Sequence, residues 1–168
     1  MPISMSQASA PRFAHMLNNL SAILAKAQAH CEARKIDPLV LTSARLYPDM
    51  FAFARQVQIC CDTAKGAVAR LAGVEIPKHE DTEKTFPELQ ARIAKTLEFM
   101  AGVKPAQIDG SEDKDIVIKT PTRELNFKGA QYLLAFAWPN FYFHAATAYD
   151  ILRHNGVELG KPDFLGGR

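Results

Sequence analysis

The sequence predicts an all-α protein, an antiparallel four-helix bundle with a minor β-hairpin. Two observations predict this fold class. Apolar residues recur at helical spacing in four long segments, and the period changes to two between the third and fourth segments. The chain has 168 residues and no internal repeat or linker. We therefore expect a single domain over residues 1–168 with one hydrophobic core.

The first predicted helix runs from about Ser9 to Ala33. Ser9 is a suitable N-cap residue, and Pro11 is tolerated in a first helical turn. The expected buried side is a one-sided apolar stripe that consists of Phe13, Met16, Leu17, Leu20, Ile23, Leu24, Ala27 and Cys31.

The second predicted helix begins with Asp49 as its N-cap and ends near Gly73. The connection before it, residues 35–49, contains two prolines and is expected to hold a short helical turn between them. The apolar stripe of this helix consists of Met50, Ala54, Val57, Cys61, Ala64, Val68 and Leu71.

The third predicted helix opens with a capping box between Thr85 and Glu88 and ends at Gly102. A β-hairpin is then predicted at about 115–128, with Thr120-Pro121-Thr122 as its turn. A lone hairpin is only marginally stable, so it must lie against the helices. The alternating apolar residues are Ile116, Ile118, Leu125 and Phe127.

The fourth predicted helix, residues 129–156, contains the longest apolar run and the only tryptophan. Pro139 lacks an amide hydrogen and crowds the carbonyl of Ala135, so we expect a kink there. Gly156 is placed to end the helix in a left-handed conformation. The remaining tail, residues 160–168, is expected to be loosely held.

This fourth helix carries two lines of residues at helical spacing, whereas a bundle helix normally needs one apolar stripe. The second line predicts a homodimer with two-fold symmetry, unless the hairpin and the 35–49 connection cover it. The dimer residues expected from this line are Leu134, Trp138, Phe141 and Leu152.

The overall composition excludes several classes of protein. The net charge is only +2, and no basic stripe with interleaved aromatic residues supports nucleic-acid binding. No segment is apolar and long enough for a membrane span, and the first residues, MPISMSQASAPRF, do not resemble a signal peptide. The three cysteines do not form a disulfide framework. We therefore expect a reduced, cytoplasmic protein.

Asn140 and His144 lie one turn apart on the fourth helix, and Gln56 or Gln58 of the second helix is expected to meet them. Two interpretations follow. The side chains satisfy one another by hydrogen bonds in the core, or they form a polar small-molecule pocket. Tyr142 and Tyr149 are the further candidates for such a pocket.

The ending N-x-x-x-H-x(7)-L-R-x-N-G, with a hairpin ahead of the fourth helix, resembles the DinB/YfiT-like four-helix-bundle superfamily. Two longer stretches are similar to a bacterial DUF family of DinB-like proteins without an assigned activity. The two stretches are RLYPDMFAFARQVQICCDTAKGAVARLAGVE and PNFYFHAATAYDILRHNGVELGKPDFLG. The narrower resemblance covers nearly the whole chain.

The superfamily resemblance implies a divalent metal held by three histidines, one on the second helix and two in an H-x-x-x-H motif on the fourth. It also implies metal-dependent transfer or isomerisation of a low-molecular-weight thiol. His144 matches the second histidine of the motif, while Asn140 replaces the first, and only Gln56 or Gln58 is available on the second helix. Amide oxygens are weak neutral donors, so no cofactor is expected, with zinc or nickel as the alternative.

Three functions remain open from the sequence. The first is a DinB-like bundle of unknown function that binds a small molecule near His144 and has a degenerate metal site formed by His144 and Asn140. The second is a metal-dependent thiol transferase or isomerase of the DinB-like type. The third is a non-catalytic structural or interaction bundle.

Overall fold

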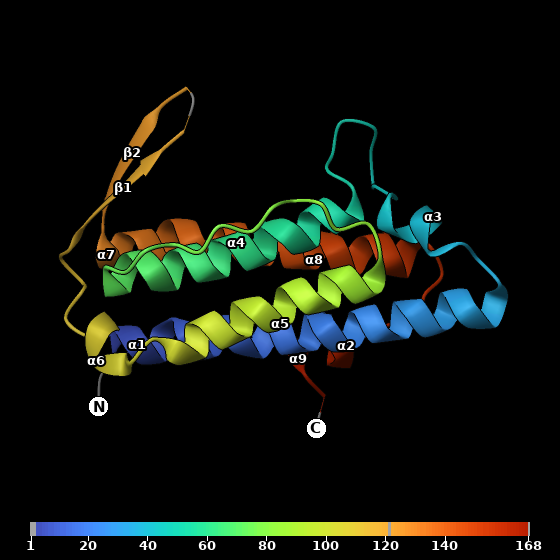
Figure 1. Cartoon of the computed structure of the whole chain (residues 1–168), viewed down its shortest axis with the longest axis horizontal. Helices are drawn as coiled ribbons and strands as arrows, with labels where there is room; N and C mark the ends of the chain where they lie inside the picture. The colour runs from blue at the N-terminus through green and yellow to red at the C-terminus, as the bar shows by residue number, and fades with distance from the viewer. Residues whose placement is uncertain (1–2, 121, 168) are drawn as a thin grey trace.

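Four long helices lie side by side and form the body of the molecule (Figure 1). They are α2 (Ala10–Arg34), α4 (Phe53–Ala72), α5 (Phe86–Gly102) and α8 (Trp138–His154). The structure is a computed structural model that describes residues 3–120 and 122–167. The predicted all-α fold with a minor hairpin is confirmed.

The connection between α4 and α5 is long because these two helices run in the same direction. Figure 1 shows residues 73–85 travelling back along the whole bundle before α5 begins. α2 and α4 are antiparallel, and so are α5 and α8. This arrangement confirms the expected bundle with a long crossing connection.

The hairpin and three of the short helices lie at the two ends of the bundle, whereas α9 (Lys161–Leu165) lies along α2 (Figure 1). The hairpin pairs β1 (Asp115–Lys119) with β2 (Glu124–Lys128) in an antiparallel register that places Ile116 opposite Phe127. Its predicted turn contains Pro121, which lies outside the described residues. The three short helices at the ends are α1 (Met5–Ala8), α3 (Pro38–Thr42) and α6 (Pro105–Ile108).

Aromatic side chains join the long helices in the core. Phe13 of α2 meets Phe141 of α8 edge to face, with ring centroids 4.9 Å apart. Phe53 and Phe86, the first residues of α4 and α5, pack in the same way at 6.0 Å. Burial of large apolar side chains of this kind is the main force that holds a bundle together.

Phe141 is buried in this core, and so is Leu152. The prediction that these two side chains face a second subunit was therefore wrong, because the neighbouring helices of the same chain cover them. Leu134, by contrast, is 53% exposed, and Trp138 is partly buried.

Two helix starts differ from the prediction. The hydroxyl of Ser9 donates to the carbonyl of Met5 at 2.7 Å and makes no capping bond, because α1 directly precedes it. Asp49 does not cap α4, which begins at Phe53 after Ala52. The amide of Phe53 instead donates to the carbonyl of Ala44 at 2.8 Å, so a contact within the preceding loop fixes this helix start.

The fourth predicted helix is divided into three parts: α7 (Gly129–Gln131), the π-helix η1 (Tyr132–Ala137) and α8. Pro139 lies in the first turn of α8, where a helix does not need that residue's amide hydrogen. The irregularity expected at the proline is thus found in the π-helical turns that precede it.

The C-terminal tail is more firmly held than predicted. It forms α9, whose Asp163 pairs with Lys26 of α2 at 2.6 Å. The side-chain nitrogen of Asn19, Nδ2, donates to the backbone carbonyl of Phe164 at 3.0 Å, and the ring of Phe164 packs against Tyr149. These contacts attach the tail to both α2 and α8. In the described ranges, 3–120 and 122–167, no helix is long and apolar enough to cross a membrane.

Candidate functional site

Polar side chains link α4 and α8 along the line where these antiparallel helices meet. His144 Nδ1 lies 2.6 Å from the side-chain oxygen of Gln56. Further along, the amide nitrogen of Asn140 donates to the hydroxyl of Thr63 at 2.9 Å. We call Gln56, Thr63, Asn140 and His144 the α4–α8 seam. In this seam both Asn140 and His144 turn toward the second long helix, where His144 meets Gln56 and Asn140 meets Thr63.

The hydrogen bonds of Gln56 determine the protonation pattern of His144. The side-chain nitrogen of Gln56, Nε2, donates to the backbone carbonyl of Phe51 at 2.9 Å. A carbonyl can only accept, so the side-chain oxygen of Gln56 must face His144, and His144 Nδ1 must donate to it. Burial, followed by the positive charge of Arg55, lowers the pKa of His144 below its ordinary value. The neutral ring therefore presents Nε2 as a hydrogen-bond acceptor.

Three other residues expected at this site lie elsewhere. Gln58 is about 200° around α4 from Gln56, and its amide nitrogen donates to Glu83 at 3.0 Å. Tyr142 is 38% exposed and packs its ring edge to face on Phe141. Tyr149 packs on α9, as described above. Their side chains point along other faces of the same two helices, so they do not join the seam.

The seam does not suit a tightly bound zinc or nickel ion. Its only imidazole already uses Nδ1 to donate, and the other donors of the seam are two neutral amides and one hydroxyl. None of these carries a negative charge to offset a divalent cation, and amide oxygens suit harder ions. Within residues 3–120 and 122–167, no three His, Cys, Asp or Glu side chains are grouped to hold a metal.

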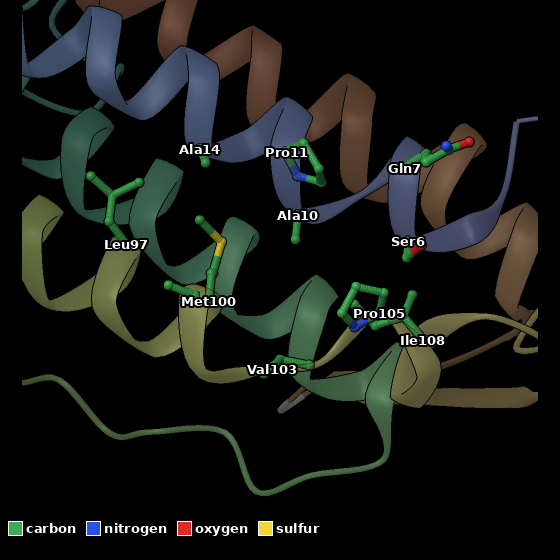
Figure 2. A pocket seen from close by; sticks show the side chains of 11 residues that line it. Ser6, Gln7, Ala10, Pro11, Ala14, Leu97, Met100, Val103, Pro105 and Ile108 are labelled. Atoms are coloured by element: carbon green, nitrogen blue, oxygen red, sulfur yellow. The ribbon is translucent and has the colours of Figure 1, made fainter.

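A separate cavity with apolar walls lies at the end of the bundle where α1 and α6 close on α2 and α5 (Figure 2). We call it the apolar cavity. Its volume is about 410 Å³, and no charged side chain is among its lining residues. Figure 2 shows Leu97 and Met100 of α5 facing Ala10 and Ala14 of α2 across this space. The other lining residues are Ser6, Gln7, Pro11, Ala101, Val103, Pro105 and Ile108.

Two short helices form one end of the apolar cavity, and its two polar lining residues, Ser6 and Gln7, both belong to α1. The backbone amide of Ser6 in α1 donates to the carboxylate of Asp109, just after α6, at 2.8 Å. Gln7 is exposed, and its side-chain oxygen accepts from the amide of Ser4 at 3.2 Å. The sequence did not predict this cavity, because helices of four residues have no periodicity that a pattern can detect.

The cysteines are part of the core and not of a reactive site. All three are free and buried. Burial raises the pKa of the Cys61 thiol to about 12 and that of Cys60 well above its ordinary range. A thiol held in its neutral form is a poor nucleophile.

The model of one protein family, described as a domain of unknown function (DUF1993), matches residues 5–165. The chain belongs to the DUF1993 family. A crystal structure of a DinB family member protein from Shewanella denitrificans is similar to this DUF1993 chain, with 45% sequence identity and a TM-score of 0.87. That similarity covers 97% of this chain and 92% of the other. No curated protein matches the sequence. The recognised DinB-like fold of this DUF1993 protein is confirmed, and its activity is unknown.

Proposed function

We propose that this DUF1993 protein is a small-molecule-binding protein that works without a metal, and that its ligand occupies the apolar cavity. The cavity is the observation that carries this proposal. Its volume falls in the range of about 300–1,000 Å³ typical of ligand sites, and such sites are mostly apolar with a few polar groups. The ligand class that fits is a small uncharged molecule, largely apolar, with one polar group that reaches Gln7 at the rim.

A ligand screen with a blocked variant tests this proposal. 1-Hexanol and indole serve as apolar probes, and hexanoate serves as the charged counterpart of hexanol. A ligand that binds only the folded state raises the melting temperature. We expect hexanol or indole to raise it in the wild type and to have a smaller effect in Ala14→Phe, which fills the cavity.

The matched control is Ala22→Phe, at an exposed position on the same helix. It should respond to the probes as the wild type does. Equal melting-temperature shifts in Ala14→Phe and Ala22→Phe would contradict binding in the apolar cavity. The absence of any shift in the wild type would favour the third function, a structural or interaction bundle.

We further propose that the α4–α8 seam joins two helices and holds no resident metal. Metal analysis of protein purified without an affinity tag should find less than stoichiometric zinc and nickel, and a chelator should leave the melting temperature unchanged. The metal-dependent thiol transferase or isomerase predicts the opposite result. Stoichiometric zinc or nickel that is lost in His144→Ala would support that enzyme and overturn our proposal.

We also propose a homodimer through α8 and η1. No Asp, Glu, Lys or Arg occurs between Lys128 and Asp150, and the exposed side chains of this stretch include Leu134 at 53% and Phe143 at 58%. A two-fold axis places the same surface of both subunits in contact, and an uncharged helix face can pack on its own copy without repulsion between like charges. The double variant Leu134→Glu/Phe143→Glu should therefore be monomeric in light scattering.

The control for the dimer is Val117→Glu, which adds a charge to another exposed apolar position, on the hairpin. It should keep the mass of the wild type. A wild type that is monomeric at high concentration would contradict the dimer. We place the protein in the cytoplasm, because three free and buried cysteines suit a reducing compartment.

A further inference from the structure

Arg92 of α5 is the centre of a charged network between α4, α5 and the 73–85 connection. Its side chain is 1% exposed. Nη2 contacts Asp62 of α4 at 2.7 Å and Asp81 of the connection at 2.9 Å. Nη1 donates to the carboxylate of Glu83 and to the backbone carbonyl of Glu80, both at 3.0 Å. Both terminal nitrogens of the guanidinium are therefore engaged.

The network is electrically balanced within itself. Lys65 pairs with Asp62 at 2.8 Å, and Arg55 pairs with Asp81. Three cations thus face three carboxylates, which is the condition for burying charges at low cost. The six residues are Arg55, Lys65 and Arg92 with Asp62, Asp81 and Glu83.

Two buried polar atoms beside this network have no hydrogen-bond partner in the described part of the chain: Nε of Arg92 and Nδ1 of His79. Both residues line a cavity of about 350 Å³ between the connection and α5. We call it the Arg92 cavity. A buried polar atom without a partner is destabilising, and native structures contain few of them. Each of the two atoms can donate a hydrogen bond, and each belongs to a residue that lines this cavity.

The lining of the Arg92 cavity holds three cations and three carboxylates, but two of the cations make no ion pair within residues 3–120 and 122–167. These two are Lys78 and Lys95. Of its carboxylates, Glu83 is bound by Arg92, and Glu88 accepts from the backbone amides at the start of α5. Glu80 remains, with only its backbone carbonyl engaged by Arg92.

Cations also dominate the electrostatic effect on His79. Burial, and then the charges of Lys65, Arg92 and Lys95, lower the pKa of His79, while Asp62 opposes them. Positive charge therefore dominates at the imidazole.

We propose that the Arg92 cavity binds a small oxyanion, a carboxylate or phosphate group, through the Nε–H of Arg92 and the Nδ1–H of His79, with Lys95 and Lys78 as countercharges. The oxyanion gives each of the two unpartnered donors an acceptor. A charge-assisted hydrogen bond from a guanidinium to an oxyanion is among the strongest that a protein makes. This site lies apart from the apolar cavity and shares no lining residue with it.

NMR titration with inorganic phosphate, and separately with acetate, tests the proposal at constant ionic strength maintained with chloride. We expect saturable shifts of the Arg92 Nε–H and His79 ring signals with at least one of the two anions. The anion with the tighter binding identifies the oxyanion class. Shifts that are absent or do not saturate with either anion would overturn the proposal.

Two variants that change the charge of the cavity lining in opposite directions test whether the anion binds in this cavity. Lys95→Gln should weaken binding by about fivefold, and Glu80→Gln should tighten it by about fivefold, the upper end of the effect expected from one exposed charge. The control Lys104→Gln removes the same charge from an exposed position outside the cavity lining and should leave binding unchanged. Equal weakening in Lys95→Gln and Lys104→Gln would show that binding follows the overall charge, and equal affinities in all three variants would likewise contradict binding in the Arg92 cavity.

The pH dependence gives an independent readout. The charges that act on His79 are those of Lys65 and Asp62 of α4 and of Arg92 and Lys95 of α5. A bound anion favours the imidazolium, so the pKa of His79 should rise on addition of phosphate or acetate, and binding should strengthen as the pH falls. A His79 pKa that stays the same in saturating anion would contradict the proposed contact.

Discussion

Gln56 illustrates how one side-chain amide can determine the chemistry of a neighbouring residue. Its nitrogen is committed to the Phe51 carbonyl, so its oxygen must accept from His144. The imidazole is therefore held as one tautomer, with Nε2 free to accept. A glutamate at this position would place a carboxylate against a carbonyl that only accepts.

Replacement of Gln56 by leucine should destabilise the protein by about 1–3 kcal/mol, because the Phe51 carbonyl and His144 Nδ1 both lose their partner. Gln56 is 1% exposed, so water cannot easily replace it. Urea unfolding followed by circular dichroism measures the change. Thr63→Val, at a partly exposed position of the same seam, should cost less. A Gln56→Leu variant as stable as the wild type would show that the seam is not structural.

The lowered pKa of His144 predicts how stability changes with pH. Below the ordinary value of 6.5 the unfolded chain takes up a proton that the folded chain does not, so stability falls as the pH drops through this range. The wild type should therefore lose more stability than His144→Gln between about pH 7.5 and pH 5.5. Urea unfolding at both pH values gives the difference. Equal losses would mean that the imidazole is not protected from protonation.

At the level of residues, the sequence predicted the position of His144 and Asn140 but not the choice between Gln56 and Gln58. That choice depends on the Phe51 carbonyl, which lies in a loop without a repeating pattern. Arg92 was missed for the same reason. Its partners Glu80, Asp81 and Glu83 belong to the irregular connection, so only the folded structure brings them to it.

At the level of elements, helix starts with a local cap were predictable and those fixed by distant contacts were not. The hydroxyl of Thr85 accepts from the amide of Glu88, whose carboxylate accepts from the amide of Thr85, so four neighbouring residues define the start of α5. The start of α4 depends on the Ala44 carbonyl. A pattern limited to neighbouring residues therefore placed that start too early, at Asp49.

Where the hairpin meets α7, a single added methyl group at Gly129 should lower the stability of the protein strongly. A Cβ at Gly129 would lie 1.9 Å from the backbone oxygen of Ser111. The amide of Ala130 already bonds to the carbonyl of Glu112, which holds the two segments together. Gly129→Ala should thus destabilise by about 1–3 kcal/mol through overpacking.

The matched variant is Gly102→Ala, near the end of α5, where a Cβ meets nothing within 4 Å. It should be neutral or stabilise by about 0.4–1 kcal/mol, because alanine restricts the unfolded chain. Thermal unfolding of the two variants side by side measures both effects. Similar melting temperatures would contradict the close packing at Gly129.

At the level of the whole molecule, one core joins all the long helices, so unfolding should be a single transition. Circular dichroism reports all helices, whereas fluorescence reports the one tryptophan, Trp138, at the start of α8. The two signals should give the same midpoint in urea. Separate midpoints would contradict the single domain expected over residues 1–168.

The four-helix architecture could be predicted because each long helix repeats its pattern over several turns. The apolar cavity could not, because it depends on how α1 and α6 close the end of the bundle. The attached tail was also missed. Five residues of α9 are too few to show a pattern, and their contacts with α2 join positions more than a hundred residues apart.

The 73–85 connection has one more consequence. It contributes no helix or strand, and side chains such as Arg92, Arg55 and Gln58 hold it in place. A nick in this segment would leave every long helix intact. The two fragments should then reconstitute the bundle on mixing, since the core supplies their affinity, and Arg92→Ala should leave the nicked segment open to further proteolysis.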